Sequence, residues 1–232
     1  MDYFTGQFVP VHGPGGNRAA WSDTLEDRRS RHDMVRQQIL ARGIRQPRLI
    51  RAMARLPRHF FTHNHQRLSA YDDHALPSDY GQTISQPLIV AVMTAALNAR
   101  PQQRILEIGT GTGYQTALLA MLYAQVFTVE CISQLSIAAQ ERLRRLGFDN
   151  ISFSIGDGSK GWAAHGKFDG IVVTAATAEV PKPLIAQLAD GGRLIIPIGK
   201  QNLQMLKQFE RCGQEIRCQD MLECRFVPLV GE

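Results

Sequence analysis

The sequence has 232 residues, a length that fits one large domain or a domain with an added subdomain. Hydrophobic residues make up 44% of it and the formal net charge is +5, an ordinary globular composition with a mildly basic balance. The basic excess lies mainly at residues 28–58 and 142–145, which favours solvated helix faces, or attraction of carboxylate-bearing molecules, over a nucleic-acid site.

The sequence predicts neither a membrane span nor an exported protein. No stretch approaches the roughly 20 apolar residues that cross a bilayer, and no basic run followed by an apolar segment opens the chain. The cysteines form no CxxC pair, which argues against a structural zinc site. We therefore expect a cytoplasmic protein with reduced thiols, no membrane partner, no nucleic-acid partner and no metal.

The first hundred residues are predicted to be helical apart from a tail and a long loop. Residues 1–30 carry a Gly-Pro-Gly-Gly stretch followed by charged residues, so we expect a flexible N-terminal extension. Apolar residues at helical spacing predict helices from residue 31 onward, over 47–55 and over 86–99. Together these helices define a helical subdomain over residues 31–100.

Residues 59–85 interrupt the helical pattern and are rich in His, Asp, Pro and Ser. A long loop of this kind is uncommon in a compact domain unless it has a function, so we expect an ordered substrate or active-site loop. His59, His63 and His65 cluster at its start, but no cysteine or pair of carboxylates accompanies them, and we predict no metal site.

From residue 101 short β-rich segments alternate with helical ones, which predicts a parallel sheet covered on both faces. The expected strands are 104–108, 125–130, 151–155, 168–174 and 193–198, and the expected helices are 114–123, 133–146 and 181–188. Two further strands, 203–210 and 222–230, would form an antiparallel hairpin about a turn at 212–214. The sum is an α/β, Rossmann-like domain over 101–232 with about seven strands.

The strongest motif is the run Glu-Ile-Gly-Thr-Gly-Thr-Gly-Tyr at residues 107–114, where a strand passes into a helix. Gly109, Gly111 and Gly113 let the backbone turn sharply, and the helix N-terminus behind them favours an anionic group. A dinucleotide-binding fingerprint would need its third glycine at position 114, which is a tyrosine here, so the third glycine comes one residue too early for that motif. The spacing, with Glu107 before the first glycine, resembles motif I of class I methyltransferases, in which the loop wraps S-adenosylmethionine. A structural turn is the alternative.

Acidic residues follow the next two predicted strands, at the edge where open α/β sheets bind ligands. Glu130 comes about 20 residues after Gly109, the spacing at which a carboxylate accepts hydrogen bonds from ribose hydroxyls. Asp157, followed by Gly158, is placed either to accept from an adenine amine or to form a simple turn. Residues 174–176, Thr-Ala-Ala, follow the fourth predicted strand. Their small side chains would either leave room for a transferred methyl group or form a tight connection from the strand to the next helix.

The run Gly-Gln-Thr-Ile-Ser-Gln-Pro at residues 81–87, together with the glycine loop, closely resembles the protein-L-isoaspartate (D-aspartate) O-methyltransferase family. Ordered matches, such as Pro57-Arg58 and Gly191-Gly192-Arg193, extend over about residues 31–230. The resemblance implies a class I fold that transfers a methyl group from S-adenosylmethionine to the free carboxylate of L-isoaspartyl and D-aspartyl residues in damaged proteins. The ester would cyclise to a succinimide, which hydrolyses partly to normal aspartate.

The resemblance also implies roles for individual residues. Ser85 is the residue that the family treats as its active-site hydroxyl. S-adenosylmethionine is expected to contact Gln82, Thr83, Ile84, Ser85, Glu107, Gly109, Gly111, Gly113, Glu130, Asp157, Gly158 and Gln204. Isoaspartyl-containing proteins and peptides are the expected partners, and the chain is expected to be a monomer.

Three positions depart from the family pattern. Ser78-Asp79 precedes Tyr80-Gly81 where the family usually has Ile-Gly, so a carboxylate in this loop could repel an isoaspartyl group or reshape the pocket. Cys131 replaces the basic residue common after the strand-ending glutamate. The alternatives are a methyltransferase of the same family that acts on another carboxylate, a small molecule or RNA, and a non-catalytic module that binds the cofactor.

Overall fold

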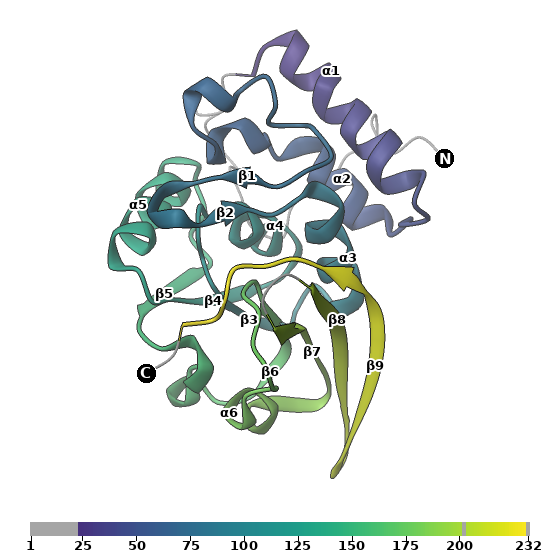
Figure 1. Cartoon of the computed structure of the whole chain (residues 1–232), viewed down its shortest axis with the longest axis vertical. Helices are drawn as coiled ribbons and strands as arrows, with labels where there is room; N and C mark the ends of the chain where they lie inside the picture. The colour runs from purple at the N-terminus through teal and green to yellow at the C-terminus, as the bar shows by residue number, and fades with distance from the viewer. Residues whose placement is uncertain (1–22, 201–202, 231–232) are drawn as a thin grey trace.

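The computed structural model describes residues 23–200 and 203–230. Its centre is a seven-stranded sheet in the order β5-β4-β3-β6-β7-β8-β9 (Figure 1). Strands β3 to β7 are parallel, and β8 and β9 continue the sheet antiparallel. The strands are β3 Arg104–Ile108, β4 Gln125–Glu130, β5 Ile151–Ile155, β6 Phe168–Val173, β7 Leu188–Lys200, β8 Leu203–Cys212 and β9 Glu215–Cys224. The predicted α/β fold is confirmed.

Helices and short helical turns pack around this sheet. The α-helices are α1 Leu25–Met34, α2 Pro47–Arg55, α3 Pro87–Leu97, α4 Tyr114–Leu122, α5 Ser133–Arg145 and α6 Lys182–Ala186. The π- and 3-10 turns are η2 Val35–Leu40, η3 Arg58–Phe61, η4 Asn64–Gln66, η5 Asp79–Gly81, η6 Gly158–Lys160 and η7 Ala163–His165. Successive residues of β3 point to opposite faces, so Ile105 joins the core beneath the N-terminal helices and Leu106 joins a second core beside α6. Burial on both faces explains the continuous apolar runs of the central strands.

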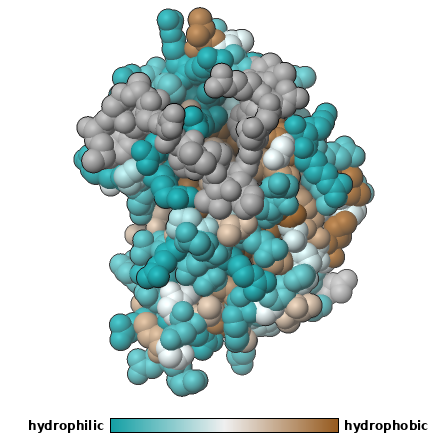
Figure 2. Space-filling view, turned by 180° about the vertical axis from the view of Figure 1, so that it is seen from behind, coloured by the Kyte–Doolittle hydropathy of each residue, from teal (hydrophilic) through white to brown (hydrophobic). Residues whose placement is uncertain are grey.

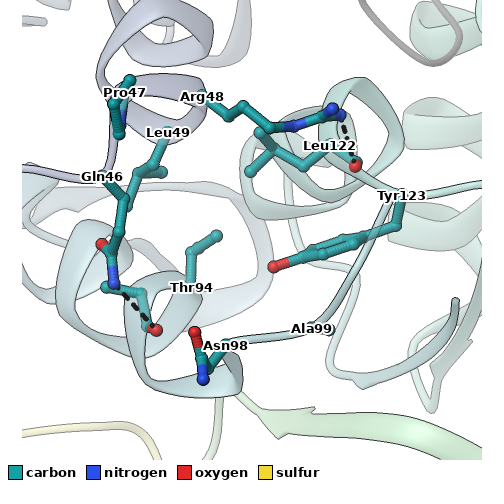
Figure 3. A pocket seen from close by; sticks show the side chains of 10 residues that line it. Gln46, Pro47, Arg48, Leu49, Thr94, Asn98, Ala99, Leu122 and Tyr123 are labelled. Carbon is teal, nitrogen blue, oxygen red and sulfur yellow. Dashed lines mark hydrogen bonds between the residues drawn. The ribbon is translucent and has the colours of Figure 1, made fainter. Parts of the chain in front are cut away.

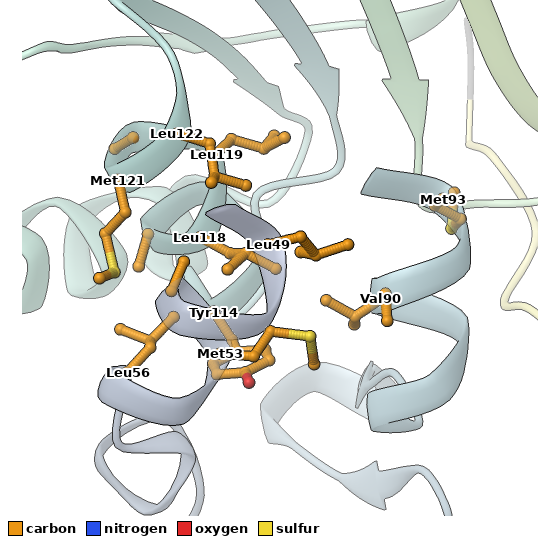
Figure 4. Close-up of a cluster of buried hydrophobic side chains, with 14 of the residues drawn as sticks. Leu49, Met53, Leu56, Val90, Met93, Tyr114, Leu118, Leu119, Met121 and Leu122 are labelled. Carbon is orange, nitrogen blue, oxygen red and sulfur yellow. The ribbon is translucent and has the colours of Figure 1, made fainter. Parts of the chain in front are cut away.

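The larger core joins α2, α3 and α4 (Figure 4). Leu49 and Met53 from α2 meet Val90 from α3 and Leu118 from α4, and all four side chains are almost wholly buried. Burying one such side chain stabilises the fold by roughly 1.5–3 kcal/mol. This packing fixes the N-terminal helices on the sheet, and with them the segment that leads into residues 81–87.

Helix α1 begins at Leu25, so the sequence-based start at residue 31 was wrong. Thr24 and Asp27 form a capping box in which each side chain accepts a hydrogen bond from the other residue's backbone N–H. Arg31 is buried and binds both carboxylate oxygens of Asp23. The charges of Asp23, Asp27 and Arg31 are therefore paired in the fold instead of marking a tail. The division into residues 1–30, 31–100 and 101–232 stays a prediction, and residues 1–22 lie outside the described part.

The second strand of the hairpin was predicted in the wrong place. Cys212 pairs with Glu215 across a two-residue turn at Gly213, which has the left-handed φ of 63°. Because the turn is tight, β9 must start at Glu215, and residues 225–230 leave the hairpin altogether. The prediction followed hydrophobicity, whereas most of β9 is polar and exposed because it is the edge strand of the sheet.

Figure 2 shows the molecule from behind, with a mostly hydrophilic face and hydrophobic residues gathered mainly along one side. Among the described residues no helix is long and apolar enough to cross a membrane. The longest, α5, has 13 residues, against the roughly 20 that a span requires.

Candidate active site

Three cavities meet at the carboxyl ends of the parallel strands, and Thr83 lines all three. The glycine-loop cavity, about 270 Å³, extends from Gln82 and the loop past Glu130 to residues 227–230. The Ser85 groove, about 550 Å³, lies between residues 73–75 and 223–228. A small third cavity joins Ser85 to the glycine loop. Two ligands held in the two larger cavities would therefore meet beside Thr83 and Ser85.

A two-stranded hairpin missed by the sequence analysis presents these residues. Strand β1, Leu76–Pro77, pairs antiparallel with β2, Thr83–Ile84. The side chain of Ile84 is buried, which anchors the hairpin, while Ser85 follows directly and faces two of the cavities. The long loop predicted over 59–85 is thus ordered by short helical turns and this hairpin.

Asp79 does not line any of the three cavities. Its carboxylate is largely exposed, and an oxygen lies 3.6 Å from Nε2 of His63. The next residue, Tyr80, has a left-handed φ of 58° at the tip of the hairpin. The departure from the family pattern at Ser78-Asp79 therefore changes the outer surface of the hairpin and adds no charge to the cavities.

The glycine loop connects β3 to α4 with three residues in the left-handed region, where only glycine is unstrained. Gly109 is the most constrained, because a Cβ there would lie 2.3 Å from Oγ1 of Thr174. That hydroxyl donates to the carbonyl oxygens of Ile108 and Gly109, which locks the loop to the end of β6. Gly109 and Gly111 line the glycine-loop cavity, whereas Gly113 caps α4 and packs against Leu143.

Gly109→Ala is expected to lower the free energy of unfolding by about 3 kcal/mol, since left-handed strain and a steric clash add. Affinity for S-adenosylhomocysteine, the expected product, should fall at least tenfold by calorimetry. Gly43→Ala is the matched control: Gly43 has a φ of 87° but open space around its Cβ position. The free energy of unfolding of this control should fall by about 1 kcal/mol, and its affinity for S-adenosylhomocysteine should not change. Equal effects of the two variants would show that the loop is not closely fitted to a ligand.

Glu130 lies at the end of β4 and is almost wholly buried in the wall of the glycine-loop cavity. One carboxylate oxygen accepts from the backbone N–H of Gly111 at 2.9 Å and the other from that of Ile132 at 3.0 Å. The oxygen that faces Ile132 also accepts a weak hydrogen bond from the Cys131 thiol at 3.6 Å. The other oxygen keeps a lone pair for one hydroxyl, and a second hydroxyl would have to replace the thiol. The ribose-binding role of Glu130 stays a prediction, for which its place in the cavity wall leaves acceptor capacity.

Glu107 lies beneath the glycine loop and not in a cavity wall. One carboxylate oxygen accepts from Thr116 and Thr128, and the other is buried without a partner among the described residues. Burial raises the pKa of Glu107 from 4.5 to about 8, against the opposing effect of the two threonine hydroxyls. At neutral pH the side chain is therefore mainly a neutral acid that ties β3 to β4 and α4.

Because Glu107 binds its proton more tightly in the folded state, the free energy of unfolding should fall as pH rises from 4.5 to 8. The contribution of one such group is at most about 1.4 kcal/mol per pH unit. Glu107→Gln, which cannot ionise, should flatten this slope in urea unfolding at pH 5, 6, 7 and 8. Glu210→Gln, a partly exposed glutamate paired with Arg193, is the control and should leave the slope unchanged.

Of three further predicted residues, Gly158 lines the glycine-loop cavity, whereas the side chains of Asp157 and Gln204 are held elsewhere. A Cβ at Gly158 would lie 2.3 Å from Ile108. Asp157 is not in the lining, because one of its carboxylate oxygens accepts from the backbone and hydroxyl of Ser159. Gln204 is also absent from the lining, and its amide oxygen accepts from the backbone N–H of Phe226 at 2.7 Å.

The segment after β9 is a wall of the site that the sequence analysis did not assign. Residues 227 and 228 line both larger cavities. The backbone is held beside the end of β6, where Ala176 donates to Val227 and accepts from Leu229. Its sequence, Phe-Val-Pro-Leu, carries no polar motif, so no signal of ligand binding marked it.

Asp23, Asp27 and His59 come close enough to be considered as metal ligands, since one ligand atom of each lies within 4.8 Å of the others. Asp23, however, binds Arg31 through both oxygens, and Asp27 binds Arg67 and Thr24. Arginine pairing already neutralises both carboxylates, so the cluster holds α1 on the helical subdomain.

Another cavity, about 180 Å³, lies between α2, α3 and the end of α4 (Figure 3). Arg48 donates to the carbonyl oxygen of Leu122, and Gln46 donates to that of Ala95. These side chains serve helix carbonyls, and none of the predicted site residues lines the cavity. We assign it to imperfect helix packing.

A glycine loop after the first parallel strand and a carboxylate after the second are the features of a class I S-adenosylmethionine-dependent methyltransferase. A family model described as Protein-L-isoaspartate(D-aspartate) O-methyltransferase matches residues 29–232. Proteins named Protein-L-isoaspartate O-methyltransferase from Syntrophus aciditrophicus and Roseiflexus castenholzii are 47% and 44% identical to this chain. The alignments cover 86% and 90% of this chain, and 93% and 94% of the relatives.

Solved structures of proteins with the same name have a similar fold. One named protein-L-isoaspartate O-methyltransferase has a TM-score of 0.79 at 28% identity, covering 88% of this chain and 66% of its own. A Plasmodium falciparum protein, described as a protein-L-isoaspartate O-methyltransferase in complex with S-adenosyl-L-homocysteine, has a TM-score of 0.77 over 87% of this chain and 99% of its own. At 23% identity it shows the shared fold.

The chain therefore belongs to the protein-L-isoaspartate(D-aspartate) O-methyltransferase family. This confirms the enzyme class that the resemblance implied.

Proposed function

We propose that this chain transfers a methyl group from S-adenosylmethionine to the free carboxylate of L-isoaspartyl and D-aspartyl residues, with Ser85 as the hydroxyl that positions the carboxylate. The observation that carries the proposal is that the glycine-loop cavity and the Ser85 groove share Thr83 and residues 227–228, with Ser85 lining the groove beside Thr83. A methyl donor and an acceptor must be adjacent, and this is where the two larger cavities adjoin.

The residues of the glycine-loop cavity fit the cofactor. Glu130 offers acceptor oxygens suited to ribose hydroxyls, and Gly109 and Gly158 pack so closely against Thr174 and Ile108 that a Cβ would displace the backbone lining the cavity. Val129, Ile132 and Leu229 supply apolar contact surface for a planar base. Asp157 and Gln204 then act by shaping the loop and the wall of the cavity.

S-adenosylmethionine, when bound, supplies a methyl group on a positively charged sulfur. The protein's own task is alignment, because the substrate carboxylate has an ordinary pKa near 4 and needs no base at neutral pH. Ser85 donates one modest hydrogen bond that orients the carboxylate, since a strong bond would quench its nucleophilicity. The wall at residues 227–228 closes the junction from the other side and limits the entry of water.

A matched peptide pair tests the proposal. Radiolabelled S-adenosylmethionine should give base-labile label on a peptide with isoaspartate and none on the same peptide with normal aspartate. Absence of label on both, with cofactor binding shown separately by calorimetry, would refute isoaspartyl repair and point to another carboxylate, a small molecule, RNA or a non-catalytic role. The monomeric state, the cytoplasmic location and the lack of a nucleic-acid partner stay predictions.

A further inference from the structure

Arg58 is a fully buried arginine that the reaction described above does not use. It opens η3 immediately after Pro57, and its relative exposure is 0%. Its guanidinium lies 5.4 Å from the centre of the Tyr114 ring, and Nη2 donates a long hydrogen bond of 3.4 Å to the carbonyl oxygen of His74. Nε and Nη1 have no hydrogen-bond partner among the described residues.

The other buried arginine of this subdomain shows what a structural role looks like. Arg31 binds both oxygens of Asp23, the carbonyl oxygen of Ala54 and the hydroxyl of Tyr71. Arg58 has no carboxylate partner within residues 23–200 and 203–230. Burial lowers the pKa of Arg58 to about 10, so the side chain stays charged at neutral pH. An uncompensated buried charge is costly to folding, and a variant without it should be easier to fold.

The neighbours of Arg58 place it behind the active site. Tyr114 lines the small cavity together with Thr83 and Ser85. His74, whose carbonyl oxygen accepts from Arg58, lines the Ser85 groove. A fixed positive charge behind both walls favours an anion at their junction, since the low-dielectric interior transmits the field of a buried charge.

We propose that Arg58 is the counter-charge for the carboxylate that binds beside Ser85, acting as a positioning residue through the wall formed by Tyr114 and His74. This proposal rests on the proposed function. A carboxylate is present in both the isoaspartyl substrate and the amino-acid part of the cofactor. The contact with His74 favours the substrate, because His74 lines the groove and not the glycine-loop cavity.

The test compares Arg58→Met, which removes the charge, with Arg58→Lys, which keeps it. Wild-type label on the isoaspartyl peptide is scored first, so that failure of the proposed function is seen independently of Arg58. Arg58→Met should raise KM for the isoaspartyl peptide about tenfold, leave Kd for S-adenosylhomocysteine within twofold, and keep or raise Tm. Arg58→Lys should recover most of the loss. Arg31→Met is the control for a paired buried arginine and should lower Tm without this change in KM.

A second readout isolates charge from shape. Competing peptides that carry isoaspartate or its uncharged amide, isoasparagine, should differ in inhibition constant for the wild type, and Arg58→Met should lose that difference. If Arg58→Met folds poorly, the same pair measured on Arg58→Lys and Arg58→Gln decides the question. A preserved preference in the neutral variant, or a fall in Tm like that of Arg31→Met with unchanged KM, would overturn the proposal. A rise in Kd for S-adenosylhomocysteine alone would assign the charge to the cofactor and overturn the substrate assignment.

Discussion

Replacing Ser85 with alanine is expected to lower kcat on an isoaspartyl peptide by about 100-fold, because the hydroxyl orients the carboxylate and misalignment of a reacting group costs a loss of this size. Affinity for S-adenosylhomocysteine should stay within about twofold. Turnover and cofactor affinity should respond differently because Ser85 lines the Ser85 groove and the small cavity but not the glycine-loop cavity. The backbone of β2 and the buried Ile84 hold the segment in place without the hydroxyl.

Steady-state kinetics with the peptide pair and calorimetry with S-adenosylhomocysteine measure the two quantities on the same preparation. Ser85→Thr, which keeps a hydroxyl, should retain more turnover than Ser85→Ala. Equal losses of turnover and cofactor affinity in Ser85→Ala would contradict the positioning role, because they would show that the segment itself had moved.

Replacing Glu130 with alanine is expected to weaken S-adenosylhomocysteine by about 10- to 100-fold, the equivalent of roughly 1–3 kcal/mol for buried groups left unpaired. The effect has two parts. The ligand loses its acceptor for the ribose hydroxyls, and the backbone N–H groups of Gly111 and Ile132 lose theirs. Glu130→Gln separates these two effects in part, because the amide side chain keeps one acceptor oxygen but carries no charge.

Calorimetry decides between the outcomes for Glu130. Glu130→Gln should fall between the wild type and Glu130→Ala, and kcat at saturating cofactor should change little in either variant. Unchanged affinity in Glu130→Ala would show that the ribose assignment is wrong, whatever the loss in stability.

The parallel sheet and the glycine loop were predictable because their signals are local. Five strands and their helices lie where the alternation of short apolar runs placed them, within a few residues, although β7 starts earlier than its apolar segment. The positions of Glu130 and Gly109 followed from spacing alone. A loop and a helix of ordinary length connect β3 to β4, so the carboxyl ends of these parallel strands lie side by side.

The remaining site features depend on contacts that spacing does not encode. Glu107 and Asp157 carry the expected residue types, but neither lines the glycine-loop cavity. One carboxylate oxygen of each accepts hydrogen bonds from nearby hydroxyl or backbone donors instead. The start of α1 was encoded by the capping box of Thr24 and Asp27, a signal that was present and not used. The path of residues 225–230 was not encoded locally, because it depends on the tight turn at Gly213 and on a partner strand far away in sequence.

The wall at residues 227–228 has a consequence for how the enzyme reaches its working state. The cavities combine residues near position 83, position 109 and position 228, so they exist only after segments separated by most of the chain have docked. Contacts of such long sequence separation form late and slowly. During synthesis the glycine loop would leave the ribosome well before its opposite wall, and a folding intermediate that lacks the docked segment would be unable to retain the cofactor. Acquisition of cofactor affinity therefore reports on the last steps of folding.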